Sequence, residues 1–423
     1  MKLAVVGAGW AGLAAAVRAV QQGHQVTLLE MAAQPGGRAR GVEVEGLSLD
    51  NGQHILIGAY LRTLDLMRTV GADIEGGLAR GPLELRYPDG RGLRMAGGPA
   101  WLGFGLAVAR CRGWTWGDRF ALLRAAAGWA LAGFRCAPSL TVDALCAGLP
   151  SAVRTLLIDP LCVAALNTPA REASAEVLLR VLRDALFGGR GTADLLLPRR
   201  SLDRLLPAPA IAWLRVHGAA VRFAHRVHTL RPGPDSDWLV DGEPFDAVVL
   251  ACTAAEAARL VQDLTPTWAA QALALRYEPI VTVYLRCPGA RLPCPMTALF
   301  EGPQAPAQYA FDNGALGGAT GVFAFVISGA AAWIERGLEA TAQAVLQQAR
   351  AAFAQGTWPQ PPTLLRALAE KRATFRCTPA LARPPALIAP RLWAAGDYVA
   401  GPYPATLEGA VRAGEAAVTL LGA

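Results

Sequence analysis

The stretch KLAVVGAGWAGLAAAVRAVQQGHQVTLLEMAAQPGGRAR, residues 2–40, decides the fold of this chain. Its apolar residues 3–6 predict a buried strand, and the pattern from 11 to about 22 predicts a helix. Residues 25–29 predict a second strand. A strand, a glycine-rich turn, a helix and a strand in this order are typical of a βαβ unit that binds a dinucleotide.

Three glycines in G-x-G-x-x-G spacing lie between the first strand and the helix. Gly7 permits a tight turn, Gly9 lets the backbone approach a pyrophosphate, and Gly12 lets the helix pack closely on the strand. Trp10 and Ala11 lie at the start of the predicted helix, where free N–H groups and the positive end of the dipole favour phosphate. A glycine triplet alone also occurs in turns that bind nothing, so the flanking elements carry the prediction.

Glu30 ends the second strand, and its carboxylate is placed to accept hydrogen bonds from ribose hydroxyls. It would repel a phosphate on that ribose, which disfavours NADP at this site. NAD and FAD remain open at this point, and the next segment separates them. QPGGR, residues 34–38, resembles the FAD-binding pattern of the amine oxidase and carotenoid desaturase superfamily. That resemblance brings Arg38 to the diphosphate, lets the backbone at Gly37 approach it, and implies FAD.

Composition limits the remaining classes of protein. The 423 residues suffice for two or three domains, and 53% of them are hydrophobic. The sequence contains no run of eighteen apolar residues, so we expect no transmembrane helix. Because the first strand begins at once, we expect no signal peptide and a cytoplasmic protein. The eight cysteines form no C-x-x-C pair, which argues against a metal site or a redox disulfide.

The net charge of +7 comes almost wholly from arginine, because Lys2 and Lys371 are the lysines of the chain. Two explanations stay open: adhesion to an anionic membrane, including the inner face of the cytoplasmic membrane, and a codon bias toward arginine. The arginines are scattered and no recognition motif appears, so we expect no nucleic-acid partner. Residues 97–135 combine tryptophans and arginines in amphipathic segments. They predict either a membrane-facing surface or a helical cap over an apolar pocket.

The remaining patterns predict further elements. Residues 42–49 and 83–95 predict hairpins, and 140–186 predict mainly helix. The other predicted strands are 221–223, 226–230, 238–240, 245–252, 280–285, 321–327 and 392–395, and the other predicted helices are 335–353 and one from 406 onward.

Several segments together resemble the squalene-associated FAD-dependent desaturases, the hydroxysqualene dehydroxylase family. They are DNGQHI (50–55), DPLCVAALNTP (159–169), Ala173-Ser174, ADLLLP (193–198) and RLWAAGDYVAGPYPATLEGAVRAGEAAV (391–418). The resemblance covers nearly the whole chain and is weakest around 75–135 and 290–320.

The resemblance implies an α/β fold with a Rossmann-like FAD-binding domain of the glutathione-reductase type. That domain is discontinuous and would comprise residues 1–75, 191–260 and 365–423. An inserted substrate-binding domain of mixed sheet plus helices would comprise 76–190 and 261–364, with the helical part at about 97–135. By the same analogy, residues 371–375 re-enter the FAD domain. Lys371 would then lie either near the flavin or in a structural salt bridge.

The resemblance also assigns further cofactor contacts. One face of the flavin ring would meet Gly52, Gln53, His54 and Ile55, and the adenine would meet the backbone of Val227. Asp397, after Gly396, would accept from a ribityl hydroxyl. The helix that starts near Thr406 would point its N–H groups at the flavin, and its first turn holds Leu407, Glu408 and Ala410. Glu408 has an alternative structural role as a carboxylate at a helix start.

The implied reaction reduces hydroxysqualene, an allylic alcohol, to squalene in squalene and hopanoid synthesis. Hydride from reduced flavin N5 would reach the allylic carbon as water leaves. Hydroxide leaves poorly, so a general acid is needed, and His54 and Tyr403 are the candidates. His54 could instead be a structural histidine.

Other readings stay open. No second G-x-G-x-x-G is present, so electrons would come from free NADPH or from a separate reductase. The alternative functions are a phytoene-type carotenoid desaturase, an amine oxidase and a flavoprotein that carries lipid without catalysis.

Overall fold

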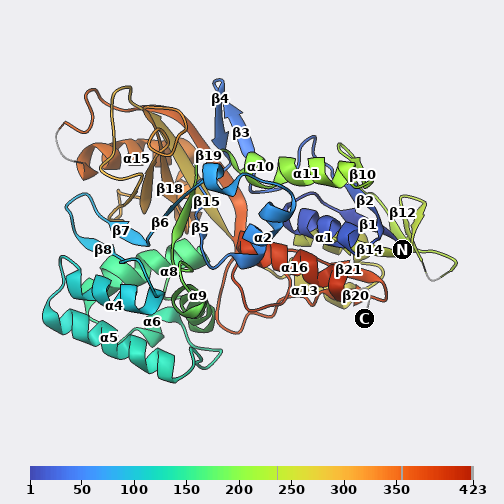
Figure 1. The fold of residues 1–423 in the computed structure, drawn as a ribbon, viewed down its shortest axis with the longest axis horizontal. Coiled ribbons are helices and arrows are strands. Elements are labelled where there is room, and N and C mark those ends of the chain that lie inside the picture. The colour runs from blue at the N-terminus through green and yellow to red at the C-terminus, as the bar shows by residue number, and fades with distance from the viewer. Residues whose placement is uncertain (236, 354–355, 421–423) are drawn as a thin grey trace.

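A six-stranded sheet occupies one end of the molecule, and both marked chain ends lie beside it (Figure 1). The computed structural model describes residues 1–235, 237–353 and 356–420. Five strands of this sheet run parallel, and β20 pairs antiparallel with β21 at its edge. The strands in sheet order are β10 (Ala220–Arg222), β2 (Gln25–Leu29), β1 (Lys2–Val6), β14 (Ala247–Leu250), β21 (Leu392–Ala394) and β20 (Leu387–Ala389).

Helix α1 (Trp10–Gln21) packs between this sheet and the last helix, α16 (Leu407–Thr419). The buried residues of α1 are mostly alanines. Because their side chains are small, another helix can approach closely. A Cβ on Gly414 of α16 would lie 2.1 Å from the carbonyl oxygen of Ala11. The first and last elements of the chain are therefore packed backbone to backbone, and α11 (Pro207–Val216) also contacts α1.

A five-stranded antiparallel sheet forms the second body of strands (Figure 1). Helix α15 (Leu338–Ala352) packs against it. Successive side chains of a strand point to opposite faces of the sheet. On one face, Val281, Val283 and Leu285 of β15 are fully buried. In sheet order the strands are β16 (Met296–Ala298), β17 (Tyr309–Asp312), β18 (Val322–Ile327), β15 (Tyr277–Arg286) and β19 (Thr363–Phe375).

A group of helices lies below the five-stranded sheet, at the lower left of Figure 1. They are α4 (Ala100–Arg110), α5 (Trp116–Leu131), α6 (Val142–Leu145), α7 (Ser151–Val153), the π-helical turn η1 (Arg154–Ile158), α8 (Asp159–Leu166) and α9 (Ala175–Phe187). The helical prediction for 140–186 is thus confirmed. In the part of the chain that the structure describes, no helix has both the length and the apolar content needed to cross a membrane.

Shorter elements complete the fold. The predicted hairpins are confirmed as β3 (Gly41–Val44) with β4 (Leu47–Asp50) and as β7 (Glu84–Arg86) with β8 (Gly92–Arg94). The remaining strands are β5 (Leu56–Ile57), β6 (Leu78–Gly81), β9 (Leu195–Pro198), β11 (Leu230–Pro232), β12 (Trp238–Val240) and β13 (Glu243–Phe245). The remaining helices are α2 (Leu61–Thr69), α3 (Ile74–Gly77), α10 (Leu202–Leu205), α12 (Ala254–Val261), α13 (Pro266–Leu273) and α14 (Ala331–Arg336).

The strand predicted at 226–230 is wrong, because β11 begins only at Leu230. Side chains satisfy this backbone in place of a neighbouring strand. Arg259 donates to the carbonyl oxygens of Val227 and His228, and Asp241 accepts from the amides of His228 and Thr229. Backbone N–H and C=O groups need no pairing with a neighbouring strand where side chains provide their hydrogen-bond partners.

One other prediction needs correction. The helix predicted at 335–353 is broken at Gly337, whose φ of 92° ends α14 before α15 begins. Residues 371–375 finish β19 and pair with β15, and their place in the FAD domain stays a prediction. The residue ranges predicted for the two domains stay a prediction, and the small sheet β5-β9-β6 draws strands from both of them.

Candidate functional site

One cavity of about 670 Å³ runs from the glycine-rich turn after β1 to the helices α4, α8 and α9. It brings together residues from both ends of the chain and from the middle. Every site residue predicted from the sequence lines this cavity except Gly12. Gly12 faces Gly7 instead, because its Cβ would lie 1.8 Å from the carbonyl oxygen of Gly7. That contact agrees with a packing role for Gly12.

Backbone atoms rather than side chains line the glycine-rich end. Gly7 has a φ of 108°, and a Cβ there would lie 2.7 Å from the carbonyl oxygen of Ala251. Gly9 is the N-cap of α1 and supplies no side chain to the free amides of the first turn. A Cβ on Gly37 would lie 3.2 Å from Gly9 Cα. The helix therefore offers N–H groups that an anion can reach.

Glu30 fastens the glycine-rich turn from the end of β2. Its two carboxylate oxygens accept from the amide of Ala8 at 2.6 Å and from that of Ala32 at 2.8 Å. The side chain is buried and also lines the cavity. Because each carboxylate oxygen can accept more than one hydrogen bond, Glu30 can hold the turn and still accept from a ligand.

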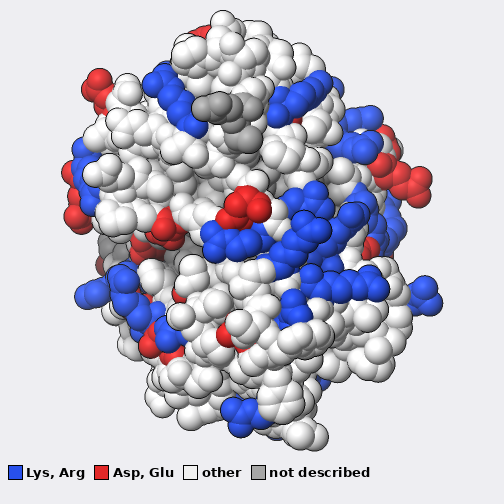
Figure 2. All heavy atoms as spheres, turned by 90° about the vertical axis from the view of Figure 1, so that its left-hand side faces the viewer, with Lys and Arg blue, Asp and Glu red and all other residues white. Residues whose placement is uncertain are grey.

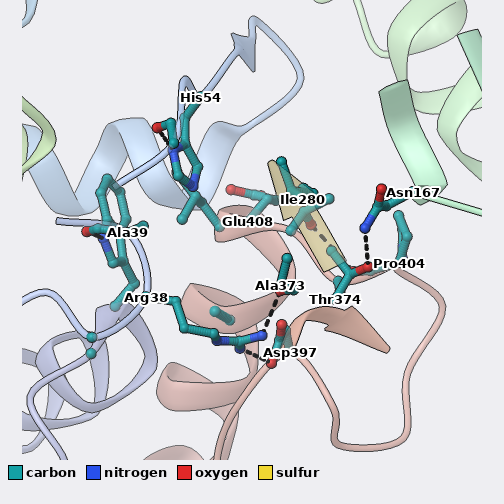
Figure 3. A pocket seen from close by; sticks show the side chains of 18 of the residues that line it. Arg38, Ala39, His54, Asn167, Ile280, Ala373, Thr374, Asp397, Pro404 and Glu408 are labelled. Atoms are coloured by element: carbon teal, nitrogen blue, oxygen red, sulfur yellow. Dashed lines mark hydrogen bonds and ion pairs between the residues drawn. The ribbon is translucent and has the colours of Figure 1, made fainter. Parts of the chain in front are cut away.

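Arg38 reaches across the cavity to the C-terminal part of the chain (Figure 3). It donates to Asp397 Oδ1 at 2.7 Å and to the carbonyl oxygen of Ala373 in β19 at 2.7 Å. Desolvation opposes the charge of the guanidinium. The Asp397 carboxylate outweighs that effect and raises the pKa of Arg38 above its usual value. The pair ties the first βαβ unit to both β19 and the end of β21.

His54 lines the cavity opposite Arg38 (Figure 3). Its Nδ1 lies 2.7 Å from the carbonyl oxygen of Gly52, so Nδ1 carries the proton and donates. Burial lowers the pKa of His54, and the positive charge of Arg38 lowers it further. A neutral His54 with its proton on Nδ1 presents Nε2 as a hydrogen-bond acceptor.

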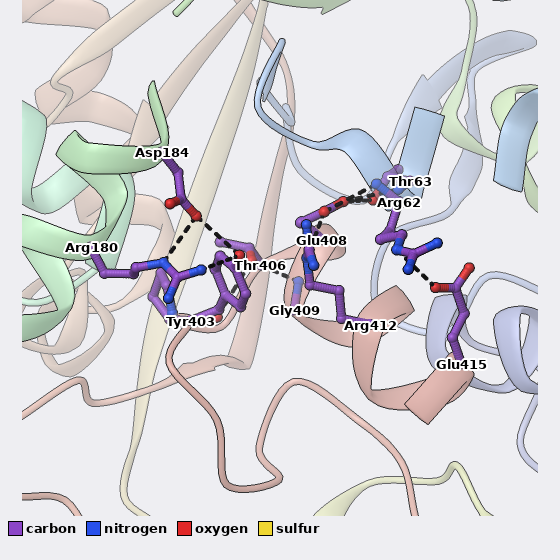
Figure 4. Close-up of polar contacts among 11 residues, drawn as sticks. Arg62, Thr63, Arg180, Asp184, Tyr403, Thr406, Glu408, Gly409, Arg412 and Glu415 are labelled. Atoms are coloured by element: carbon purple, nitrogen blue, oxygen red, sulfur yellow. Dashed lines mark hydrogen bonds and ion pairs between the residues drawn. The ribbon is translucent and has the colours of Figure 1, made fainter. Parts of the chain in front are cut away.

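A second polar cluster joins α9 to the loop before α16 (Figure 4). The Tyr403 hydroxyl donates to Asp184 Oδ2 at 3.0 Å and accepts from Arg180 at 2.9 Å. Arg180 also donates to Asp184 Oδ2 at 3.0 Å. Burial is the main cause that raises the pKa of Tyr403 above its usual value. Tyr403 and Asp184 both line the cavity, so a protonated phenol and a carboxylate lie together at its wall.

The start of α16 is held by two side chains with different tasks. Thr406 is the N-cap, and its Oγ1 accepts from the amide of Gly409 at 3.1 Å. Glu408 is buried and accepts from the amides of Arg62 and Thr63 in the first turn of α2 (Figure 4). Arg412 also donates to Glu408 at 2.8 Å. Glu408 therefore joins the starts of two helices, because its carboxylate accepts from free amides of α2 and from Arg412 of its own helix.

The other end of the cavity is apolar. It is built from β7 and β8, from α4, α8 and α9, and from strands of the five-stranded sheet. Its side chains include Leu83, Leu85, Leu93, Phe104, Leu157, Leu161, Val181, Leu182, Leu186, Ile280, Met296 and Phe311. A hydrocarbon ligand is favoured in such a chamber because its burial removes apolar surface from water.

Four residues of this site received no role from the sequence. Asn167 hydrogen-bonds Thr374 Oγ1 and the carbonyl oxygen of Glu278, and all three residues border the five-stranded sheet. Arg180 and Asp184 are spaced i, i+4 on a predicted helix, but their partner Tyr403 lies 219 residues further on. The hydroxyl of Tyr398 is buried without a hydrogen-bond partner, and Tyr398 lines the cavity. Only the fold shows these contacts.

Other predictions concern Lys371 and metals. Lys371 is exposed on β19, and its neighbours Glu370 and Arg372 line the cavity in its place. All eight cysteines are free thiols. Among the residues described, no three or more histidine, cysteine or carboxylate side chains gather as metal ligands would.

Comparison with known proteins places this architecture among flavoproteins. Residues 10–421 match the family described as flavin containing amine oxidoreductase. The chain is 32% identical to a hydroxysqualene dehydroxylase of Rhodopseudomonas palustris, across 99% of this chain and 97% of that protein. It is 28% identical to the hydroxysqualene dehydroxylase of Sinorhizobium fredii, across 98% and 97%. Similarity to a zeta-carotene desaturase of Zea mays is 34% but spans 22% of this chain and 19% of that protein.

Solved structures agree on the fold. An oxidoreductase from Methanosarcina mazei superposes with a TM-score of 0.76 at 15% identity and covers 99% of this chain and 100% of that one. Cyclohexylamine oxidase from Brevibacterium oxydans superposes with a TM-score of 0.72 at 18% identity and covers 99% and 98%. The predicted α/β fold, with a Rossmann-like sheet and a separate substrate sheet, is thereby confirmed.

Proposed function

The chain belongs to the flavin containing amine oxidoreductase family, and we propose that it uses FAD to reduce hydroxysqualene to squalene with loss of water. This reaction would serve squalene and hopanoid synthesis. The end-to-end similarity to hydroxysqualene dehydroxylases supports the substrate, since the similarity to a carotenoid desaturase spans 22% of the chain. The observation that carries the proposal is the cavity, which joins a glycine-lined polar end to a hydrocarbon-lined chamber.

The polar end fits FAD. The missing side chains at Gly9 and Gly37 leave a cradle of backbone, and the Tyr398 hydroxyl is buried with no partner from the protein. We propose that Glu30 holds the adenosine ribose, with the backbone of Val227 near the adenine. The amides of Gly9, Trp10 and Ala11 would bind the diphosphate with help from Gly37 and Arg38. The residues that line this end support these assignments.

The flavin half would lie between the C-terminal segment and residues 52–55. Asp397, beside Gly396, would accept from the ribityl chain while it holds Arg38. The first turn of α16, from Thr406 to Ala410, would direct its amides toward the ring. Gly52, Gln53 and Ile55 would border one ring face with His54.

When bound, reduced FAD supplies a hydride from N5 to the allylic carbon of the substrate. The protein must then hold the hydrocarbon in place, exclude water and protonate the departing hydroxyl. The apolar chamber performs the first two tasks because its lining side chains offer no competing hydrogen bonds.

Tyr403 is the better supported source of the proton. A phenol is protonated in the neutral range, and Asp184 and Arg180 fix the hydroxyl of Tyr403 at the cavity wall. His54 has a lowered pKa and presents an acceptor, so we propose that it orients a hydroxyl group rather than protonates one.

Electrons would reach the cofactor from a separate donor. The sequence has no second dinucleotide fingerprint to hold a nicotinamide, so the donor is either free NADPH or a separate reductase.

Anaerobic turnover tests the function. The protein is loaded with FAD, reduced with dithionite and mixed with hydroxysqualene in the absence of oxygen. We expect squalene by gas chromatography and one oxidised flavin per squalene formed. Conversion of phytoene by the oxidised protein, with no squalene in the first assay, would identify a desaturase instead. Oxidation of an amine would identify an amine oxidase. Absence of redox turnover with any polyprenoid would leave a lipid carrier.

A further inference from the structure

Helix α5 exposes a continuous apolar stripe. Trp116, Phe120, Leu123, Ala127 and Leu131 follow one another at helical spacing, and we call them the α5 stripe. Trp116 is 76% exposed, Phe120 70% and Leu131 90%. Large side chains of this kind normally face a protein core, and contiguous exposed ones mark an interaction surface.

Most residues of α5 are not buried by the rest of the protein. Leu122 is the single buried residue among the sixteen residues of this helix. The neighbouring helix α4 extends the apolar surface with Trp101, Leu102 and Leu106, each about half exposed. The helix itself is well formed, because Thr115 and Asp118 make a reciprocal capping box at its start.

The charged residues of the segment 97–135 are mostly positive. Residues 97–135 hold five arginines and one carboxylate, Asp118, which the capping box already uses. Arg110, Arg112, Arg124 and Arg135 are exposed. Figure 2 shows a largely white lower surface, at the height of α4 and α5 in Figure 1, with blue side chains gathered above it. Apolar and tryptophan side chains beside arginines suit the interface of an anionic lipid bilayer.

Helix α4, which packs beside α5, borders the apolar chamber. Phe104 of α4 lines the cavity, whereas Trp101 and Leu106 of the same helix face solvent. Helix α9 also has apolar side chains toward both the cavity and the solvent, because Leu186 lines the cavity and Phe187 is 52% exposed. A single layer of helix therefore separates the chamber from the apolar side chains that α4 and α9 expose.

We propose that the α5 stripe and the exposed side of α4 dock onto an anionic lipid bilayer, from which the apolar chamber receives its substrate. The delivery of substrate rests on the proposed function, whereas the docking does not. A second copy is disfavoured as the occupant, because it would set five arginines against five with one carboxylate on each side.

Vesicle co-sedimentation of the full-length, FAD-loaded protein tests the docking. We expect binding to phosphatidylcholine vesicles that contain phosphatidylglycerol and weaker binding to phosphatidylcholine alone. The triple variant Trp116→Ser, Phe120→Ser and Leu131→Ser should lower the partition coefficient about tenfold for each side chain removed. The matched control Val216→Ser with Leu273→Ser removes exposed apolar side chains of α11 and α13 and should bind like the wild type.

Arginine variants separate the charge from the apolar contact. Arg124→Gln and Arg135→Gln should each weaken binding to the phosphatidylglycerol vesicles about fivefold, and high salt should remove this difference. Wild-type binding by the triple variant, or no binding of the wild type to either vesicle, would overturn the proposal. A change of oligomeric state in the triple variant without vesicles would overturn it in favour of a second copy.

Turnover distinguishes this proposal from the proposed function. The triple variant should retain wild-type flavin content and wild-type turnover of detergent-dispersed hydroxysqualene, and lose turnover of vesicle-borne substrate. Vesicle binding without turnover of hydroxysqualene in either form would support the docking and reject the function. Equal turnover of vesicle-borne substrate by both proteins would reject delivery through this surface.

Discussion

At the scale of single residues, the site holds a phenol and an imidazole whose pKa values are moved by burial. Tyr403 stays protonated in the neutral range, and His54 stays neutral. Both line the cavity, but Tyr403 alone has a charged pair, Asp184 and Arg180, that fixes its hydroxyl. The two candidates for the general acid are therefore separated by their partners.

Tyr403→Phe should slow the reoxidation of reduced flavin by substrate about a hundredfold or more, because the proton donor is lost. Stopped-flow absorbance under anaerobic conditions measures this rate, and flavin content checks that the site remains formed. Asp184→Asn should have a smaller effect, since the phenol keeps its own proton. A larger loss in His54→Asn than in Tyr403→Phe would contradict the assignment.

Asp50, at the end of β4, gives a pH-dependent prediction. Burial is the main cause that raises its pKa to about 7, and the Asp203 carboxylate adds to it. The folded protein thus binds a proton that the unfolded chain releases above about pH 4. The contribution of Asp50 to stability is complete below that pH and is lost as the pH rises through about 7.

Asp50→Asn should remove this pH dependence, because the amide stays neutral and its oxygen can still accept from the amide of Leu202. We expect the variant to match the wild type near pH 4 and to exceed it by a few kcal/mol above pH 7. Urea unfolding at several pH values measures the difference. If the free energies of unfolding of the two proteins differ by the same amount at all pH values, titration of Asp50 is not the cause of the difference.

At the scale of elements, the contact between α1 and α16 completes the cofactor end. α1 directs its free amides to the cavity, and α16 starts at the same cavity. Their close approach requires small residues at the crossing, as Gly414 and Ala11 show. Glu408 adds α2 to the same assembly.

Gly414→Ala should destabilise the protein by about 1–3 kcal/mol, because the new methyl group overlaps the backbone of α1. The matched control is Gly128→Ala in α5, where nothing lies within 4 Å of the new Cβ. That control should stabilise its helix by up to about 1 kcal/mol. Chemical unfolding measures both, and equal effects would show that the α1–α16 crossing can relax.

At the scale of the whole molecule, the pair Arg38–Asp397 joins segments that are 359 residues apart. The guanidinium also binds the carbonyl oxygen of Ala373, so the six-stranded sheet, the loop after β21 and the five-stranded sheet meet at one side chain. Movement of the two sheets relative to each other would break these hydrogen bonds. The cofactor end and the substrate end are therefore held in one arrangement.

A double-mutant cycle tests that coupling. Arg38→Met and Asp397→Asn should each destabilise the apoprotein, and the two together should show a coupling energy of about 1–2 kcal/mol. The exposed pair Arg171–Glu172 provides the control, with a coupling energy near zero. Urea unfolding gives the energies. If the effects of the two substitutions on the free energy of unfolding are additive, the Arg38–Asp397 ion pair does not stabilise the fold.

Much of the cofactor end could be predicted from the sequence. The glycines 7, 9 and 12, the acid at 30 and the pattern QPGGR lie within forty residues, where spacing and periodicity reflect local geometry directly. The strand predicted at 226–230 failed for the opposite reason. Arg259 and Asp241 satisfy its backbone, and neither residue is adjacent to it in the sequence.

The sequence by itself determined the βαβ unit, the turn that can hold a dinucleotide and the family to which the chain belongs. The first two features depend on residues that are close together in the chain, and the family is visible in motifs spread along the chain. The tertiary structure alone decided which groups become partners: Arg38 with Asp397, Tyr403 with Asp184, and Glu408 with the start of α2. It also decided that the α5 stripe faces outward. Partner choice and exposure depend on how distant elements pack, and no local pattern records that.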